Sequence, residues 1–211
     1  MSTSEPTRSP YEGVALSEED LNSDPLAELR AWIERARNDG LPEPGAMCLA
    51  TVGGEAQPSA RMVLLRGLDS GLVFFTSYGS RKGRDLAANP RAAAVFYWPQ
   101  IQRQIRIEGR IEQVAESESD AYFASRPRGH QLSAWASEQS DILDSREILE
   151  RRLEDFDLRF GGQSVPRPHS WGGYRLIPHR IEFWQGRVNR MHDRLEFTRT
   201  GAEWQLHRLS P

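Results

Sequence analysis

The chain has 211 residues, of which 27 are basic and 30 acidic, so its formal net charge is −3. This length suits one domain with a substantial core. The near balance of charge argues against a protein that binds nucleic acid or an anionic membrane through a global field. No run approaches the ~20 apolar residues that a membrane helix needs, and the first residues lack the basic and apolar regions of a signal peptide.

The single cysteine, Cys48, cannot form an internal disulfide. Together with the missing secretion signal, this predicts a reducing, cytoplasmic location. Cys48 lies in the apolar run 46–52, where core packing is favoured over a role as a nucleophile. The sequence contains no H-x-x-x-H or C-x-x-C spacing, so we expect no metal site.

Residues 1–22 are polar, contain proline and show no periodicity, so we expect a mobile N-terminal arm and then a single domain over 23–211. Asp24-Pro25 predicts the start of a helix, because the carboxylate can cap free amides and proline suits the first helical position. Gly40 marks the end of this helix. One apolar face recurs along it, with Trp32 beside Leu26, Leu29, Ile33 and Ala36.

Strand-like alternation begins at Ala46 and predicts strands over 46–52, 58–66, 72–76, 92–98 and 103–114. The loop 77–83 is rich in small residues, ends in Arg81 and Lys82, and leads into a short helix, 84–88. Loop amides, a helix N-terminus and two cations are typical of a phosphate-binding site, although the G-x-x-x-x-G-K-[ST] spacing of a Walker loop is absent. Taken alone, this signal is weak.

Two further helices are expected in the second half of the chain. The pattern Ser117-Glu118-Ser119-Asp120 is a capping box, and the helix that it opens ends before Pro127. Arg126 and Arg128 bracket that proline, either to interact with the helix dipole or to form an anion pocket with Tyr122. Residues 131–140 are expected to form a polar loop. Asp144-Ser145 then caps a longer helix with core-spaced apolar residues, which Gly161-Gly162 closes.

The stretch 181–197 reads I-E-F-W-Q-G-R-V-N-R-M-H-D-R-L-E-F, with strand-like alternation on both sides of a polar cluster. The cluster contains Trp184, Arg187, Arg190, His192 and Arg194. The arginine fork of donors fits a phosphate or an enolate-like oxygen, and an indole offers a flat face for a ring. The alternative is a solvated loop whose charges face water.

The expected strands number roughly seven or eight, and most of their connections are hairpin-like. They predict a mainly β protein of the α+β class, in which a closed antiparallel barrel carries peripheral helices, because closure removes exposed strand edges.

Short motifs over nearly the whole chain from Asp24 resemble the pyridoxamine (pyridoxine) 5′-phosphate oxidase family. They are Arg61-Met-Val-Leu-Leu-Arg66, Phe74-Phe-Thr-Ser-Tyr-Gly-Ser-Arg-Lys82, Arg103-Gln104, Ser125-Arg-Pro-Arg128, Glu138-Gln-Ser140, Trp171-Gly-Gly173, Glu182-Phe-Trp-Gln-Gly186, Asn189-Arg-Met-His-Asp-Arg194 and Arg208-Leu-Ser-Pro211. Each motif is short, but their joint order is specific. The resemblance implies a homodimer of FMN-binding split barrels, with FMN at the subunit interface and oxidation of a phosphorylated vitamin B6 ring by O2.

The resemblance also implies roles for individual residues. The cofactor-binding positions are Arg61, Met62, Val63, Leu64, Leu65, Arg66, Phe75, Thr76, Arg81, Lys82, Gln104, Gln139, Ser140, Trp184 and Arg194. The substrate-binding positions are Arg8, Tyr11, Arg66, Tyr122, Arg126, His130, Arg190 and His192. Arg190 and His192 are also the implied catalytic pair, which orients the reacting carbon and stabilises charge at the ring oxygen.

Two positions depart from the family pattern. Arg66 replaces a usual lysine and His130 replaces a usual serine, both in the implied substrate-phosphate pocket. Arginine keeps the charge and changes its geometry, and the charge of histidine varies near neutral pH. The changes are either tolerated drift or the sign of an altered affinity or substrate. Two other functions therefore stay open: a related flavin oxidase of another ring, such as a phenazine precursor, or a flavin-binding barrel without turnover.

Overall fold

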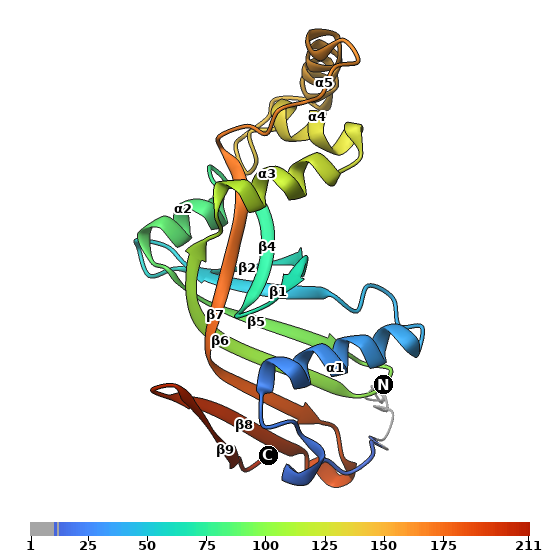
Figure 1. Ribbon diagram of the computed structural model, residues 1–211, viewed down its shortest axis with the longest axis vertical. Coiled ribbons are helices and arrows are strands. Elements are labelled where there is room, and N and C mark those ends of the chain that lie inside the picture. Colours follow the sequence, from blue (N-terminus) through green and yellow to red (C-terminus); the bar gives the residue numbers. More distant parts are fainter. Residues whose placement is uncertain (1–10, 12) are drawn as a thin grey trace, which may run out of the picture. The chain divides into compact units, whose positions relative to one another are not determined.

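A computed structural model describes residue 11 and residues 13–211 (Figure 1), so Arg8 lies outside the described residues. The helices are η1 (Glu18–Asp20), α1 (Pro25–Asn38), α2 (Arg81–Ala88), α3 (Glu116–Ser125), α4 (Arg128–Ala136), α5 (Arg146–Phe160) and η2 (Val188–Arg190). The strands are β1 (Ala46–Val52), β2 (Pro58–Leu64), β3 (Gly67–Leu68), β4 (Leu72–Ser77), β5 (Arg91–Trp98), β6 (Arg103–Gln113), β7 (Trp171–Gln185), β8 (Asp193–Thr200) and β9 (Glu203–Arg208). Within the described chain, no helix is long and apolar enough to cross a membrane.

The strands belong to one sheet with the order β2-β1-β5-β6-β7-β4-β3, and β8 and β9 continue from β7 off this path. The pairings of β3 with β4, β4 with β7, β7 with β8 and β8 with β9 are antiparallel. Among the described residues this order is an open path, whereas the sequence argument expected a closed ring. Strand β3 lies at one end of the path. It has only two residues, so it offers few backbone groups for hydrogen bonds to a further strand that would close the ring.

The chain divides into two compact units, and the long strands contribute to both. Unit 1 comprises the described residues up to Cys48 together with Ala94–Glu108 and Pro178–Pro211. Unit 2 comprises Leu49–Ala93 and Gly109–Ile177. The expected division into an arm, 1–22, and one domain, 23–211, stays a prediction.

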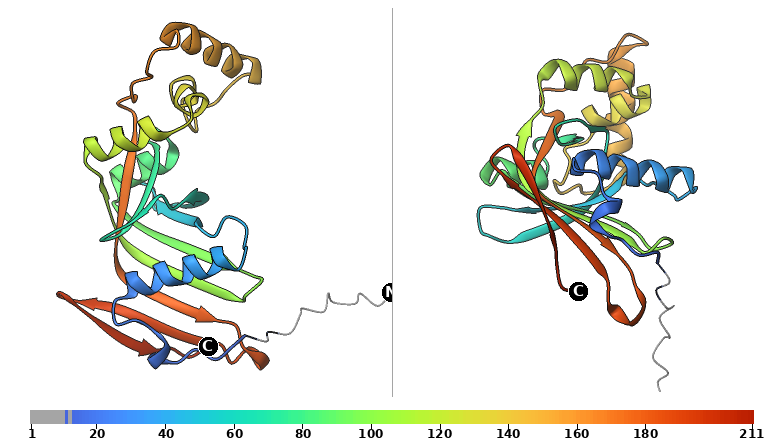
Figure 2. Two further views of the ribbon diagram at one scale, coloured as in Figure 1. Left: turned by 45° about the vertical axis from the view of Figure 1, so that its right-hand side comes forward. Right: turned by 60° about the horizontal axis from the view of Figure 1, so that its bottom comes forward.

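In unit 1, helix α1 begins as its sequence predicts. Asp24 accepts a hydrogen bond from the Leu26 amide at 3.0 Å, and Pro25 is the first helical residue. Trp32 is buried and meets the edge of Phe183 on β7, with ring centroids 5.1 Å apart. Strands β8 and β9 form a hairpin, visible from two further directions in Figure 2. Helix α1 and strand β7 thus both contribute to the core of this unit.

The first strand shows which side of the sheet its cysteine occupies. Met47 and Leu49 of β1 are fully buried, and Cys48 between them is only half-buried. Successive side chains of a strand point to opposite faces. The expectation that Cys48 packs in the core is therefore wrong, because the apolar run hid a two-residue alternation.

Unit 2 carries helices α2 to α5, which follow one another along the chain in Figure 1. Helix α2 starts at Arg81, three residues earlier than expected, because Ser80 caps it by accepting from the Gly83 amide at 3.3 Å. The expected loop at 131–140 is wrong over most of its length, since α4 occupies Arg128–Ala136. Leu132 and Ala136, four residues apart, are buried and anchor α4.

Helix α5 ends as predicted, with Gly161 in a left-handed conformation at φ 46°. Its apolar face was expected to enter the core, yet none of its residues is buried. Phe156 and Phe160 instead pack against Trp135 of α4, with ring centroids 5.6 and 5.5 Å away. The aromatic spacing therefore predicts a helix–helix contact and overestimates its burial.

Candidate functional site

Unit 2 contains a cavity of about 1200 Å³. Residues from β2, β4, α2, α3, α4 and the segment after α4 line it. The predicted site residues among them are Arg61, Met62, Val63, Leu64, Arg66, Phe75, Thr76, Arg81, Lys82, Tyr122, Arg126, His130, Gln139 and Ser140. Small-molecule pockets commonly measure about 300–1,000 Å³, so this volume has room for more than one small ligand. Leu65 belongs to the same unit but does not line the cavity.

Lys82 is a buried cation of this cavity, with 8% of its surface exposed. Its Nζ donates to Thr76 Oγ1 at 2.9 Å, Gln139 Oε1 at 3.1 Å and Ser80 Oγ at 3.3 Å. Burial, and secondarily the charge of Arg61, lowers the pKa of Lys82 to about 8. A lysine held by neutral oxygens alone retains its attraction for an anion.

Arg61 projects from β2 and is held by a polar set within unit 2. It donates to Thr51 Oγ1 at 2.8 Å, Ser59 Oγ at 2.7 Å and the Leu49 carbonyl at 3.2 Å. Asp85 of α2 lies 3.6 Å from its guanidinium and accepts from Thr51 at 2.7 Å. These partners fix the direction of the fork beside Lys82.

Three aromatic rings form a stack at the cavity. Phe75 lies 3.9 Å from Tyr122 with the planes 14° apart, and Trp171 is 5.6 Å from Phe75 and nearly parallel to it. Gly173 makes this possible, because a Cβ there would lie 2.7 Å from the Phe75 ring. Offset stacking of this kind holds rings rigidly. The Tyr122 hydroxyl group is thereby carried on a fixed scaffold.

Arg126 follows α3 and lies over the Trp171 ring, with its guanidinium carbon 4.6 Å from the ring centroid. Its Nη1 is buried and has no hydrogen-bond partner. Burial is the main cause that lowers the pKa of Arg126, with the charge of Arg66 acting in the same direction. An unpaired buried donor is costly unless a ligand completes it. The position therefore suits an anion.

The remaining predicted residues of the cavity are more exposed. Arg66, Arg81, His130, Gln139 and Ser140 are all exposed, and His130 comes from the first turn of α4. Ser140 adopts φ 78°, a left-handed conformation that is unusual for serine. These residues supply further donors along the cavity lining.

The other predicted site residues belong to unit 1. Trp184 and His192 lie 4.7 Å apart between ring centroids, and Tyr11 meets His192 edge-on at 5.1 Å and Trp184 at 5.8 Å. Gln104 is half-buried on β6, and Arg190 is exposed in η2. The structure thus brings Tyr11, Trp184 and His192 together, and their implied roles stay predictions.

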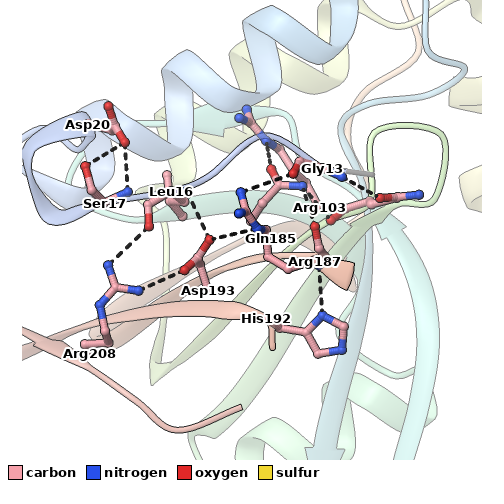
Figure 3. A network of polar contacts seen from close by, with 12 residues as sticks. Gly13, Leu16, Ser17, Asp20, Arg103, Gln185, Arg187, His192, Asp193 and Arg208 are labelled. Carbon is pink, nitrogen blue, oxygen red and sulfur yellow. Dashed lines mark hydrogen bonds and ion pairs between the residues drawn. The ribbon is translucent and has the colours of Figure 1, made fainter. Parts of the chain in front are cut away.

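The orientation of His192 is fixed by the backbone. The Arg187 amide donates to His192 Nδ1 at 3.1 Å (Figure 3), so a neutral ring carries its proton on Nε2. Partial burial lowers the pKa of His192, and the charge of Arg190 lowers it further. Asn189 and Arg190 both have positive φ values, 56° and 60°. This turn presents the arginine beside the imidazole without an ion pair among the described residues.

Arg194 has different surroundings from the ring cluster. It donates to both oxygens of Glu182, at 2.8 and 3.1 Å, and Glu182 is 3% exposed. Arg106 also donates to Glu182, at 3.0 Å. Its guanidinium is therefore neutralised within this chain, and its implied contact with a flavin stays a prediction.

Sequence reasoning missed Glu182 and Trp171 as parts of these sites. Glu182 stood in the motif beside Trp184, but its partners depend on the register that pairs Trp184 with Arg194. Trp171 stood only in the motif Trp171-Gly-Gly173, without an implied role. The glycines after it were the available signal, because they leave space for neighbouring rings. Within residues 11 and 13–211, no group of three or more His, Cys, Asp or Glu is arranged to hold a metal.

Two family models match the chain. Residues 33–160 match the model described as pyridoxamine 5′-phosphate oxidase. Residues 171–211 match the pyridoxine 5′-phosphate oxidase C-terminal dimerisation region. Curated relatives from Acaryochloris marina and Burkholderia lata, both named pyridoxine/pyridoxamine 5′-phosphate oxidase, are each 53% identical to this chain. The alignments cover 97% of this chain and 94% of the first relative, and 100% of both chains for the second.

Solved structures agree with the expected fold. PhzG from Burkholderia lata, in complex with tetrahydrophenazine-1-carboxylic acid, has a TM-score of 0.89 at 33% identity, covering 96% of this chain and 100% of that chain. An FMN-binding protein from Nostoc punctiforme, related to pyridoxamine 5′-phosphate oxidase, has a TM-score of 0.71 at 17% identity, covering 94% and 100%. The α+β split barrel with peripheral helices predicted from the sequence is confirmed.

Proposed function

Because this chain belongs to the pyridoxamine 5′-phosphate oxidase family, we propose that it oxidises pyridoxamine or pyridoxine 5′-phosphate to pyridoxal 5′-phosphate. With the amine, one O2 and one water are consumed, and ammonia and hydrogen peroxide are released. With the alcohol, O2 is reduced to peroxide and no water is needed. When bound, FMN supplies the two-electron chemistry that joins these half-reactions.

One observation carries the proposal: two cations of the cavity, Lys82 and Arg126, are buried or half-buried and form no ion pair with any described residue. Lys82 has only neutral oxygen partners, and Arg126 has aromatic faces and a buried donor without a partner. A phosphorylated cofactor and a phosphorylated substrate bring two phosphates. The two sheltered cations, Lys82 and Arg126, match that pair of ligands in charge.

The residues fit the phosphate of FMN. Arg61, Arg81 and Lys82 offer cations, and Gln139 and Ser140 offer neutral donors at the same cavity. Neighbouring side chains hold Lys82 and Arg61 at the cavity, and Lys82 exchanges one of its three oxygen partners for the phosphate. Met62, Val63 and Leu64 of β2 add an apolar edge suited to a flat ring.

The substrate phosphate is assigned to Arg126, Tyr122, Arg66 and His130, which line the same cavity. The fixed Tyr122 ring directs its hydroxyl group, and Arg126 offers its unpaired Nη1. Such preorganised donors lower the cost of ordering on binding.

Arg190 and His192 are assigned to the reacting ring. The neutral imidazole is a donor at Nε2, because its Nδ1 accepts from the Arg187 amide. Arg190 supplies a positive charge without a carboxylate partner among the described residues. Together they can orient the exocyclic carbon and hold negative charge at the ring oxygen. The dimerisation region supports a homodimer, and we place FMN at its subunit interface on the resemblance alone.

A second candidate is oxidation of a reduced phenazine carboxylic acid, favoured by the structural likeness to PhzG. PhzG and one of the curated relatives named pyridoxine/pyridoxamine 5′-phosphate oxidase both come from Burkholderia lata. This chain is 53% identical to the relative there that is named for the vitamin B6 reaction, and 33% identical to PhzG. The difference favours the phosphorylated pyridine.

Purified protein reconstituted with FMN tests the proposal. We expect peroxide and pyridoxal 5′-phosphate in equal amounts from pyridoxine 5′-phosphate, and ammonia in addition from the amine. A reduced phenazine carboxylic acid serves as the competing substrate. Turnover of the phenazine alone would replace the proposed function, and bound FMN without turnover of either class would indicate a flavin-binding barrel.

A further inference from the structure

Side chains from strands β8 and β9 and from two turns hold the backbone of residues 13–16 in unit 1 (Figure 3). The Gly13 amide donates to Gln102 Oε1 at 3.1 Å, and its carbonyl accepts from Arg187 at 3.2 Å. The Leu16 amide donates to Asp193 Oδ2 at 3.1 Å, and its carbonyl accepts from Arg208 at 3.2 Å. Both polar groups of both residues therefore have side-chain partners, and the Leu16 side chain is buried.

The next turn adds a charged contact. Arg208 of β9 donates to both oxygens of Glu18, at 3.0 and 2.8 Å, and its third nitrogen donates to Asp193 Oδ1 at 2.9 Å. Glu18 lies in η1, where Ser17 and Asp20 close the turn through hydrogen bonds of 2.8 Å. Arg208 thus joins Glu18 in the N-terminal segment to Asp193 on β8.

Asp193 also connects this contact to the ring cluster. Its Oδ2 lies 3.7 Å from Arg187 Nε, and the Arg187 amide donates to His192 Nδ1. Tyr11, two residues before Gly13, meets the edges of His192 and Trp184. Gly186 leaves room for this ring, since a Cβ there would lie 2.6 Å from it. Asp193 and Arg187 therefore contact both the N-terminal segment and the residues that orient the His192 imidazole.

We propose that Glu18, Arg208 and Asp193 act as positioning residues: they latch segment 13–20 onto β8 and β9, and so hold Tyr11 against His192. The term latch denotes these three side chains. Its catalytic consequence rests on the proposed function, whereas the docking of the segment does not. Asp193 anchors both the segment and Arg187, so opening the latch loosens Tyr11 and His192 together.

The Glu18–Arg208 ion pair is too exposed to contribute much to global stability, which distinguishes a positioning role from a general structural one. Glu18 and Arg208 side chains are 47% and 42% exposed, and exposed ion pairs add little to global stability. Chain ends open locally at low free-energy cost. A modest bidentate contact can therefore shift the docked population severalfold while leaving the unfolding transition of the protein unchanged.

The test compares Glu18→Gln with Glu19→Gln in the full-length protein. Glu19 is the adjacent exposed glutamate, and it forms no hydrogen bond or ion pair with any described residue. We expect hydrogen exchange at the Gly13 and Leu16 amides to speed up roughly 3- to 10-fold in Glu18→Gln. Exchange in Glu19→Gln and the melting temperatures of both variants should match those of the wild type.

The catalytic readout uses the FMN-loaded enzyme with pyridoxamine 5′-phosphate. We expect kcat/KM of Glu18→Gln to fall by roughly the same 3- to 10-fold and Glu18→Asp to recover part of it. Salt near 1 M should lower kcat/KM of the wild type toward that of Glu18→Gln, because exposed charges are screened there within about 3 Å. Screening of the substrate phosphate acts on both proteins, so the variant should lose less of its kcat/KM than the wild type does.

The possible outcomes keep the latch and the proposed function separate. Unchanged exchange at Gly13 and Leu16 in Glu18→Gln, or an equal effect of Glu19→Gln, would overturn the latch. Faster exchange with unchanged kcat/KM would overturn its positioning role. Faster exchange in a protein whose wild type lacks oxidase activity would support docking by the latch and refute the proposed function.

Discussion

Two arginines of unit 1 and two cations of the unit 2 cavity are held in opposite ways. In unit 1, Arg194 is bound to a buried carboxylate and Arg208 to two carboxylates. In the unit 2 cavity, Lys82 has neutral oxygens around it, and Arg126 leaves a buried nitrogen unpaired. A neutralised cation supports the fold, whereas a cation without a counter-charge retains its attraction for a ligand. This difference marks Lys82 and Arg126 as cations available for phosphate.

Arg190 is the test case within unit 1, because it has no ion pair or hydrogen bond among the described residues. We expect Arg190→Ala to keep bound FMN and to lower kcat by about 100-fold or more, the typical loss when a donor to developing charge is removed. Rapid-mixing kinetics and flavin absorbance measure the two quantities. The backbone at φ 60° tolerates alanine as it tolerates arginine, since both carry a Cβ.

The matched control is Arg199→Ala, an exposed arginine of β8 whose guanidinium lies 5.8 Å from the Trp204 ring centroid. It should retain kcat within about twofold, as surface substitutions have small effects. Unchanged turnover in Arg190→Ala would remove this residue from the mechanism.

Paired methionine substitutions test the comparison directly. Arg194→Met leaves the buried Glu182 with Arg106 as its remaining ion-pair partner among the described residues, so we expect a loss of about 2 kcal/mol or more in the free energy of unfolding. Arg126→Met should leave stability unchanged or slightly higher, because it removes an unpaired buried donor. It should raise KM for the phosphorylated substrate by roughly 10- to 100-fold.

Urea unfolding and steady-state kinetics on both proteins separate the two effects. If Arg126→Met destabilised the protein as much as Arg194→Met does, the proposed distinction between structural and ligand-binding cations would be wrong.

Lys82 predicts a pH dependence for the cofactor-free protein. Its pKa is lowered to about 8 by burial, so between pH 8 and its ordinary value the unfolded chain binds the proton and the folded chain does not. Stability therefore rises with pH across that window, by on the order of 3 kcal/mol in total. Below pH 8 the destabilisation is fully present. Lys82→Met should flatten this rise, which urea unfolding across the pH range measures.

Binding of a phosphate should restore the charge of Lys82. We expect FMN binding near pH 9 to take up a proton, seen as a buffer-dependent heat in calorimetry. Lys82→Met should lose this uptake and bind FMN more weakly. Equal uptake in both proteins would assign the proton to another group.

The sequence predicted much of the cavity because its residues lie in contiguous motifs. Arg61 to Leu64 line it from β2, Phe75 to Ser77 from β4, and Arg81 and Lys82 from α2. Contacts that depend on strand register were not predictable in the same way. The stack of Trp171 on Phe75 requires the pairing of Phe75 with Gly173, and the Arg194–Glu182 pair requires the register of β7 with β8. Helix α4 was missed because Gly129 and several polar residues outweighed its two buried positions.

The smallest effect is expected at Arg66, where the family usually has lysine. Arg66 is exposed at the cavity, and its charge helps to lower the pKa of Arg126. Arg66→Lys keeps this charge and exchanges a planar fork for a point charge. We therefore expect KM for pyridoxamine 5′-phosphate to change by about 3-fold and the affinity for FMN to stay the same. Because Arg81 is an exposed cation of the same cavity, Arg81→Lys is the matched control and should alter FMN affinity first. An unchanged KM in Arg66→Lys would show that the two cations are equivalent at this position, so that Arg126 and Tyr122 decide the phosphate geometry.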